Sequence, residues 1–555
     1  MKKSLLMTFF VVTFFALTAV SAAAVENDTV KVGLRYGSTA LFSANLENAV
    51  GDGYEFGYFD DSREFESLGW TDERAISMTA AGDIYMSGDG TYSASVPSGG
   101  YRHIGAWHVE ISGFRDFDDA QDAAWNYNDA YPAWIDWEYV VRVGCYDSRS
   151  EAESAAAELG EGYAVKSSTT GVVVTVTRST EILFEFDCSG ILDLGVLPSS
   201  RGEEAVTWFK GYRYAGGFSY PRVTGGNLSV INVLDLEDYV KGVITSEMSG
   251  SWPLEALKAQ AVCARTYACR TSKHLSASGF DVCATSDCQV YNGRGQASST
   301  SDQAVEETAG EMLYYDGYLV QDPVYHASNG GATEDAANVW GTEKGYLKGK
   351  ADPYESRTAI SNYSWTVTYS ASELSWILQQ KGYDVGTVKN VYVSEYTPMG
   401  NVKKVVFEGS SGTKTVTGDT CRTIFYSSTY NKSVKSLRFS INGGGPVSGS
   451  GVYVNGSGDS LPSLDGVSVI SGSGTITALD GDTVSAISST GISTVTSGGT
   501  TAVKPTSGKT DSFTITGTGN GHNVGMSQYG AKAMAEAGYS YQDILEFYYT
   551  DITIW

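Results

Sequence analysis

Residues 236–267 read LEDYVKGVITSEMSGSWPLEALKAQAVCARTY, and the fold of the following half of the chain is best inferred from this stretch. Pro253 suits the first turn of a helix, and Glu255 in that turn complements the helix dipole. The alanine-rich run that follows has high helix propensity. The pattern therefore predicts a helix that continues to Arg270.

Glu247 precedes this helix, between Ser246 and Met248, where we expect a partly apolar loop. Burial in such a loop raises the pKa of a carboxyl group, so that it can serve as a general acid. Judged by residue type alone, a glutamate is more often a solvated surface charge. Lys258 and Arg265 are seven residues apart, close to two helical turns, so both project from one helix face.

The same stretch resembles the SpoIID/LytB family, whose signature is close to Y-x-K-G-V-x-x-S-E-M-x-x-x-W-P-x-E-A-L-K-A-Q-A-V-x-A-R-T-Y. Nearly every element of that signature stands between Tyr239 and Tyr267. Further motifs support it: CQVYNG at 288–293, YHASNGGAT at 325–333, WG with YLK between 340 and 348, and GTGNGHNVGMSQYGA at 517–531. The resemblance covers roughly Lys210 to Trp555, apart from one Gly/Ser-rich insertion.

This resemblance implies that Glu247 is the catalytic acid/base of a peptidoglycan lytic transglycosylase. Such an enzyme cleaves the MurNAc-GlcNAc bond of glycan strands, here expected to be peptide-free, and leaves 1,6-anhydromuramic ends. One carboxylate suffices, because the muramic acid C6 hydroxyl replaces the attacking water. Most glycosidases need two carboxylates. Glu237, Asp238 and Glu255 are the candidates for a second one if the enzyme hydrolyses instead.

The family motifs also supply candidate substrate contacts. We expect these to be Lys258, Arg265, Gln289, Tyr325, His326, Ser328, His522, Gln528 and Tyr529. For Lys258 and Arg265 the alternative is an ordinary helix-surface cation. For His326, Ser328 and His522, which stand beside glycines, the alternative is a structural hydrogen bond.

His274, Cys283 and Cys288 form a candidate metal site. Two thiolates and an imidazole suit Zn²⁺, and some SpoIID relatives hold zinc near this motif with a His and two Cys. We expect a structural zinc ion, although a fourth ligand is not evident from the sequence. The alternative is a Cys283–Cys288 disulfide, which is plausible for an exported protein.

An internal repeat lies upstream of the catalytic segment. HVEISGF at 108–114 is echoed by VVRVGCY at 140–146, and an alanine-rich helical stretch follows each copy. The pattern resembles the SPOR domain, which implies a ferredoxin-like unit that binds glycan strands stripped of stem peptides. Tethering such a unit to the catalytic domain raises the local substrate concentration.

The fold class we predict is α+β and multidomain: a β-rich N-terminal region, a ferredoxin-like SPOR-type domain and a mixed α/β SpoIID-like catalytic domain with an insertion. The expected ranges are a signal peptide at 1–24, the β-rich region at 25–100, the SPOR-like domain at 101–180, catalytic parts at 181–439 and 511–555, and the insertion at 440–510. The insertion is rich in Gly, Ser and Thr, which is typical of a flexible segment or of a small β-module.

Charge and the N-terminal sequence bear on location and partners. With 38 Lys and Arg against 64 Asp and Glu, the net charge of −26 repels phosphate backbones, so we expect no nucleic-acid partner. Lys2 and Lys3 precede an apolar run and a small-residue site, which predicts secretion to the cell wall or, if the signal is uncleaved, anchoring there. We expect no span in the mature chain. Peptidoglycan is the expected partner, with an N-acetylmuramoyl-L-alanine amidase acting upstream; the alternative function is a non-catalytic amidase enhancer.

Overall fold

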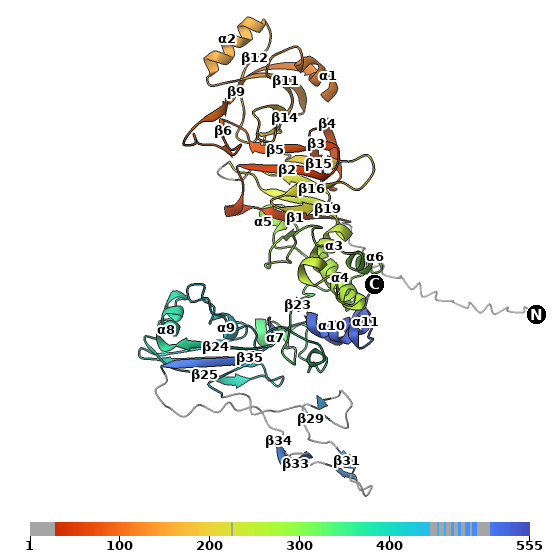
Figure 1. Cartoon of the computed structure of the whole chain (residues 1–555), viewed down its shortest axis with the longest axis vertical. Helices are drawn as coiled ribbons and strands as arrows, with labels where there is room; N and C mark the ends of the chain where they lie inside the picture. Colours follow the sequence, from red (N-terminus) through yellow and green to blue (C-terminus); the bar gives the residue numbers. More distant parts are fainter. Residues whose placement is uncertain are drawn as a thin grey trace, which may run out of the picture.

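The computed structural model describes residues 28–223, 226–443 and 511–555, together with six short strands between 452 and 496. The predicted signal segment, 1–24, lies outside the described residues. The molecule is elongated, with two large sheets at one end, a helical layer in the middle and smaller sheets at the other end (Figure 1). This mixed, β-rich arrangement confirms the α+β class. Within the described part of the chain, every helix is too short or too polar to cross a bilayer.

The first large sheet has seven strands and carries strand β1 (Thr29–Arg35) next to β19 (Val230–Asp235), the strand that leads into residues 236–267. Its order is β20 (Val282–Cys283), β1, β19, β18 (Gly217–Tyr220), β15 (Leu194–Ser199), β3 (Gly53–Phe59) and β4 (Phe65–Thr71). β1 pairs antiparallel with β19 and parallel with β20, so the N-terminal region is built into the structure around the site.

The second large sheet has ten strands, which come from the predicted ranges 25–100, 101–180 and 181–439. Its order is β12 (Tyr163–Lys166), β9 (Trp107–Phe114), β11 (Glu138–Tyr146), β10 (Ala130–Ile135), β14 (Ile182–Asp187), β13 (Val172–Val176), β5 (Ala75–Ala80), β2 (Ser43–Val50), β16 (Val206–Phe209) and β17 (Tyr212–Tyr214). The expected boundaries at 100 and 180 therefore fall within one continuous sheet. A small sheet of β7 (Tyr92–Ser93), β6 (Ile84–Ser87) and β8 (Tyr101–Ile104) lies beside it.

The internal repeat forms one β-α-β-β-α-β unit, with helices α1 (Phe117–Ala124) and α2 (Arg149–Leu159). Its four strands are antiparallel, in the order β12-β9-β11-β10. Val109, Ile111, Val141 and Val143 face the helices and form its core. A buried ion network ties the unit to the rest of the sheet, because Arg142 on β11 lies 3.2 Å from Glu110 on β9 and 2.6 Å from Glu185 on β14.

The helical layer follows β19. Its helices are α3 (Leu236–Glu247), α4 (Leu254–Cys269), α5 (Leu275–Ser278), α6 (Ser299–Glu306), α10 (Gln528–Glu536) and α11 (Tyr541–Tyr548). α4 confirms the helix predicted after Pro253, and its alanines are buried against α3, α6, α10 and α11. Small side chains on α4 allow this close packing from several sides. The C-terminal helices therefore complete the same layer as α3 and α4.

Short sheets and helices form the remaining part. The strands are β21 (Leu313–Tyr315), β22 (Tyr318–Leu319) and β37 (Ile552–Ile554); β23 (Tyr325–His326) and β36 (Met526–Ser527); β24 (Ser364–Ser370), β35 (Ser512–Thr518) and β28 (Phe439–Ile441); and β25 (Val388–Tyr396), β26 (Val402–Gly409) and β27 (Thr413–Thr417). The helices are α7 (Ala336–Trp340), η2 (Glu355–Arg357), α8 (Ala371–Gln380) and α9 (Thr420–Thr423), while η1 (Gly37–Thr39) follows β1.

The two flanks of the predicted insertion meet in one sheet. β28 and β35 pair antiparallel, with Ile441 opposite Ile515. Within the insertion, the described strands pair as three separate two-stranded sheets. They are β29 (Val452–Tyr453) with β30 (Ser460–Leu461), β31 (Ser468–Ile470) with β32 (Ile476–Ala478), and β33 (Thr483–Ser488) with β34 (Gly491–Thr496).

Candidate active site

Glu247 is the last residue of α3. The helix begins at a cap in which an Asp235 carboxylate oxygen accepts hydrogen bonds from the backbone N–H groups of Glu237 (2.8 Å) and Asp238 (3.3 Å). It ends where Met248 turns to extended backbone and buries its side chain. The loop expected around Glu247 is therefore corrected: a helix terminus fixes the position of this carboxyl group.

The surroundings of Glu247 favour its neutral form. The side chain is half-buried, and this burial raises its pKa. Two hydrogen bonds oppose the shift: Val290 N–H donates to Oε1 at 3.0 Å, and the Gln528 side-chain amide also contacts the carboxyl group. The negative end of the α3 dipole further disfavours a carboxylate. A carboxyl group whose neutral form is favoured in this way has the chemistry of a general acid.

Three of the expected contacts gather around Glu247. The Gln289 amide links two tyrosines, since its Oε1 accepts from the Tyr239 hydroxyl and its Nε2 donates to the Tyr325 oxygen, both at 3.0 Å. Burial, followed by the charge of Glu247, raises the pKa of Tyr325. Gln528 Nε2 lies 3.4 Å from Gln260 Oε1. Gln289, Tyr325 and Gln528 are thus held next to the candidate acid by buried polar contacts.

A second group of expected contacts, formed by His326, Ser328 and His522, lies around the residue after Tyr325. His326 donates from Nδ1 to the Val524 carbonyl at 3.0 Å, while its Nε2 and the Ser328 hydroxyl are buried without a partner. The His326 and His522 rings are 5.2 Å apart, and Trp340 lies 5.1 Å from His522. Burial lowers the pKa of His522 to about 4, so its ring is neutral at neutral pH.

Tyr529 takes a different position from the other C-terminal candidates. Its ring packs 4.9 Å from Trp252, and its backbone N–H donates to the Ala327 carbonyl. Tyr529 therefore joins the loop before α4 to the segment that carries His326.

Lys258 and Arg265 have structural partners in place of the expected substrate contact. Arg265 is 0% exposed and forms a bidentate pair with Glu237 at 2.6 and 2.8 Å. Lys258 pairs with Glu255 at 2.9 Å and with Glu307 at 2.6 Å. Both cations are neutralised by protein carboxylates, which leaves neither available for a charged ligand.

The candidate metal ligands come together, and the structure adds a fourth. Donor atoms of His274, Cys283, Asp287 and Cys288 all lie within 4.8 Å of one another. His274 Nε2 is buried without a hydrogen-bond partner, and both cysteines are free. A tetrahedral zinc site has ligand–ligand distances of about 3.3–3.8 Å, so small side-chain rotations would complete it. The donor set of two sulfurs, one nitrogen and one oxygen fits zinc.

Comparison with known proteins identifies the family. The family model described as stage II sporulation protein (SpoIID) matches residues 224–315. An uncharacterized protein of Brachyspira hyodysenteriae is 32% identical over 326 residues, which cover 59% of this chain and 68% of that protein. The chain belongs to the SpoIID family.

Two named relatives come from Bacillus subtilis. Its stage II sporulation protein D is 27% identical over 367 residues, covering 63% of this chain and 81% of that protein. Its amidase enhancer is 34% identical over 330 residues, covering 57% of this chain. The match spans 40% of the length of the amidase enhancer.

Glu355, a carboxylate outside the segment matched by the SpoIID family model, was not predicted from the sequence. Glu355 is fully buried and accepts hydrogen bonds from the backbone N–H groups of Asn329 and Gly330 at 2.7 Å, and from the Ser527 hydroxyl at 2.6 Å. It therefore fixes the loop after His326. The SNGG motif signals a tight turn, but its partner is distant in sequence and could not be identified from the motif.

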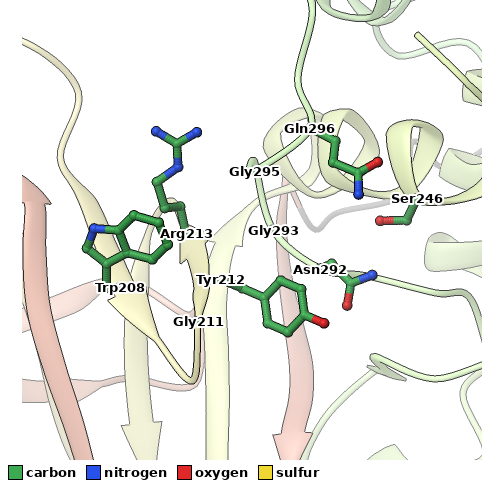
Figure 2. Close-up of a pocket in the computed structure, with 9 residues that line it drawn as sticks. All are labelled: Trp208, Gly211, Tyr212, Arg213, Ser246, Asn292, Gly293, Gly295 and Gln296. Carbon is green, nitrogen blue, oxygen red and sulfur yellow. The ribbon is translucent and has the colours of Figure 1, made fainter.

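A cavity of about 220 Å³ that is lined in part by Ser246, the chain neighbour of Glu247, was also missed (Figure 2). One wall is the β16–β17 hairpin, which precedes the segment matched by the SpoIID family model. The lining residues are Trp208, Gly211, Tyr212, Arg213, Ser246, Asn292, Gly293, Gly295 and Gln296. Exposed aromatic residues at a hairpin are a common surface feature, so the sequence alone gave no reason to place them at the site.

Proposed function

We propose that this SpoIID-family chain is a peptidoglycan lytic transglycosylase with Glu247 as its catalytic acid/base. It cleaves the MurNAc-GlcNAc bond of peptide-free glycan strands and leaves 1,6-anhydromuramic ends. The observation that carries the proposal is the half-buried Glu247 carboxyl group at the end of α3, whose pKa is raised by burial and not by a neighbouring carboxylate.

The other carboxylates of this segment are engaged elsewhere. Glu237 binds Arg265, and Asp238 lies 2.9 Å from Arg294. Glu255 pairs with Lys258 and accepts the backbone N–H of Tyr541 at 2.8 Å. Two-carboxylate hydrolysis needs a second free group about 5–9.5 Å from the first. The engagement of all three candidates favours the one-carboxylate route.

The proposed reaction returns Glu247 to its starting state. The protonated carboxyl group donates its proton to the glycosidic oxygen, and the bond from that oxygen to muramic acid C1 breaks. The C6 hydroxyl then attacks C1, and the Glu247 carboxylate accepts the hydroxyl proton. No water is consumed. Val290 N–H and Gln528 stabilise the carboxylate between the two proton transfers.

Replacing Glu247 by glutamine tests the proposal. We expect Glu247→Gln to lower the rate about 10²–10⁴-fold, because general acid–base catalysis is lost, while binding of peptide-free strands is retained. Products are analysed by mass spectrometry for 1,6-anhydromuramic ends. Glu255→Gln is the matched control and should keep most of the activity.

Other products would contradict the proposal in distinct ways. Reducing ends formed by the wild-type protein would indicate hydrolysis and a second carboxylate. Retained binding without any cleavage by the wild-type protein would favour the second candidate function.

The second candidate is an amidase enhancer, and the name of the Bacillus subtilis relative supports it. In that role the chain binds glycan strands and presents them to an N-acetylmuramoyl-L-alanine amidase. The amidase would also be the expected partner of a transglycosylase, because it removes stem peptides first. Both functions place the protein outside the cytoplasm at the cell wall, as the N-terminal sequence predicts.

We also propose that His274, Cys283, Cys288 and Asp287 hold a structural zinc ion. Bound there, zinc would cross-link the loop that leads directly to Gln289 and Val290, which touch Tyr325 and Glu247. Its contribution is to hold this loop in place, and the proton transfers remain with Glu247.

For the internal repeat we propose a SPOR-like, ferredoxin-like glycan-binding unit. The strand order β12-β9-β11-β10 and the two helices support this assignment. Trp125, Trp137 and Tyr163 are each more than half exposed and offer ring faces for sugars.

A further inference from the structure

Two segments that hold Glu247 also line the cavity. Ser246, which lines the cavity, is the neighbour of Glu247 on α3. The segment that hydrogen-bonds Glu247 through Val290 N–H reaches the hairpin three residues later, where Gly293 forms a β-bridge with Arg213. Three residues span at most about 10 Å, so one short saccharide can reach both places.

Close packing fixes the geometry of this wall. Gly293 has a φ of 64°, and a Cβ atom there would lie 2.0 Å from the Arg213 carbonyl oxygen. The same carbonyl accepts the backbone N–H of Arg294 at 2.7 Å. Only glycine allows the two backbones to approach so closely, and the hairpin is therefore held against the catalytic segment.

Arg213 is an unpaired cation at this cavity. Arg213 is exposed, its guanidinium group lies 5.5 Å from the Trp208 ring, and within the described part of the chain it has no carboxylate partner. Two cations nearby are paired, in contrast: Lys241 with Glu306 at 3.5 Å, and Arg294 with two aspartates. In a chain of net charge −26, a free arginine at a cavity that Ser246 also lines can attract an anionic ligand.

Two aromatic rings complete the wall. Trp208 and Tyr212 are 41% and 44% exposed, and Tyr212 points toward the gap in which Asn292 and Gln296 also lie (Figure 2). The Tyr212 ring, with these amide groups opposite (Figure 2), suits a neutral sugar ring that carries hydroxyl and acetamido groups, and Trp208 lies beside Arg213 across the hairpin.

We infer that this cavity is a muramic acid subsite in which Arg213 binds the free lactyl carboxylate and the Trp208 and Tyr212 rings contact the sugar. The inference rests on the proposed function. A muramic acid that still carries its stem peptide has an uncharged amide at this position. An arginine fork pairs with a carboxylate through charge-assisted hydrogen bonds that an amide cannot replace. Arg213 is thus the residue that distinguishes peptide-free strands from substituted ones.

Binding measurements on the full chain in a Glu247→Gln background test this subsite without turnover. The ligands are peptide-free glycan strands, strands that retain stem peptides, and GlcNAc oligomers of equal length without a lactyl group. We expect Arg213→Gln to weaken binding of peptide-free strands about tenfold and to leave the other two affinities unchanged. Arg213→Lys should recover part of the loss. Trp208→Ala should weaken binding of all three ligands.

The matched controls are Arg357→Gln, an exposed arginine 5.2 Å from the Tyr354 ring, and Trp376→Ala, a tryptophan of similar exposure on α8. Both should bind like the parent protein. Equal losses for all three ligands in Arg213→Gln, or no loss, would overturn the inference. Cleavage by the wild-type protein together with unchanged Arg213→Gln binding would overturn the subsite and leave the proposed function intact. Binding of peptide-free strands that depends on Arg213, without cleavage by the wild-type protein, would support the subsite and overturn the proposed transglycosylase function.

Discussion

Glu247 sits where the folded protein opposes its charge. Burial and the C-terminal end of α3 both disfavour the carboxylate, and only Val290 N–H and Gln528 stabilise it. The free energy of folding therefore depends on the ionisation of this group. A group whose pKa is raised by folding destabilises the protein above its unfolded pKa, and this cost disappears at lower pH.

This argument predicts that Glu247→Gln raises the melting temperature at pH 7. Glutamine keeps the oxygen that accepts the Val290 hydrogen bond and removes the charge. The gain should shrink as the pH falls and vanish below about pH 4, where an unfolded glutamate is itself protonated. Thermal unfolding followed by circular dichroism over this pH range measures it.

Glu395 provides a control of opposite sign. Hydrogen bonds from Lys403 and Lys404 lower its pKa, so Glu395→Gln should lose stability at pH 7, if only slightly at this partly exposed site. A Glu247→Gln variant that melts below the wild type at pH 7 would show that the carboxylate is stabilised after all.

At the residue scale, the sequence predicted the site residues that stand in recognisable motifs. Glu247, Gln289, Tyr325 and Gln528 stand in motifs, and the structure brings them together. The expected substrate contact of Arg265 is not supported, because the side chain is buried in an ion pair with Glu237. The sequence does not show which charged side chains of a helix are buried. Arg213 was missed because its role depends on Gly293, which is distant in sequence.

Among the elements, the loop from Cys283 to Val290 joins the candidate metal site to the acid. Cys283 ends β20, which pairs with the N-terminal strand β1, and Val290 contacts Glu247. The loop is anchored at both ends, and a metal ion between His274 and the two cysteines would prevent it from opening.

We predict that Cys283→Ser abolishes zinc binding and speeds amide hydrogen exchange at residues 288–291. Loss of one thiolate weakens a tetrahedral site strongly, and the freed loop then opens more often. Mass spectrometry measures both the metal content and the exchange. Cys145→Ser, a cysteine away from the cluster, should retain metal and protection. Wild-type protein with little zinc and two fewer free thiols would point to the disulfide instead.

Sequence patterns predicted where helices and strands lie better than they predicted which strands pair with one another. The Pro253 signal located α4 within one residue, and the repeat located the β-α-β-β-α-β unit. The ten-stranded sheet could not be predicted, because strand pairing depends on contacts between residues far apart in sequence. The pairing of β2 with β16 is one such contact.

On the scale of the whole molecule, the residues on either side of the predicted insertion lie next to each other, on the paired strands β28 and β35. Asn442 N–H donates to the Thr514 carbonyl at 2.7 Å, and Thr514 N–H donates to Asn442 Oδ1 at 2.9 Å. The ends of the segment 444–510 are therefore adjacent in a sheet that forms without it.

Replacing 444–510 by a short Gly-containing turn should preserve the fold. A shorter connection costs less closure entropy, and we expect unchanged stability or a gain of up to about 2 kcal/mol. Urea unfolding and the glycan-cleavage products provide the measurements. A variant with the same segment in scrambled order should behave like the wild type. Failure of the shortened chain to fold would mean that the segment contributes to the core.

The ten-stranded sheet also constrains how one glycan is engaged. It has the proposed glycan-binding unit at the β12 edge and the hairpin with Trp208 and Arg213 at the β17 edge. At about 4.8 Å per strand, these edges are roughly 40 Å apart along the sheet. Modules on a flexible tether can adjust their spacing, whereas two contacts on one sheet cannot. Under the proposed function, glycan strands too short to span this distance would lose one of the two contacts and dissociate sooner, which would set a lower limit on the length of the cleavage products.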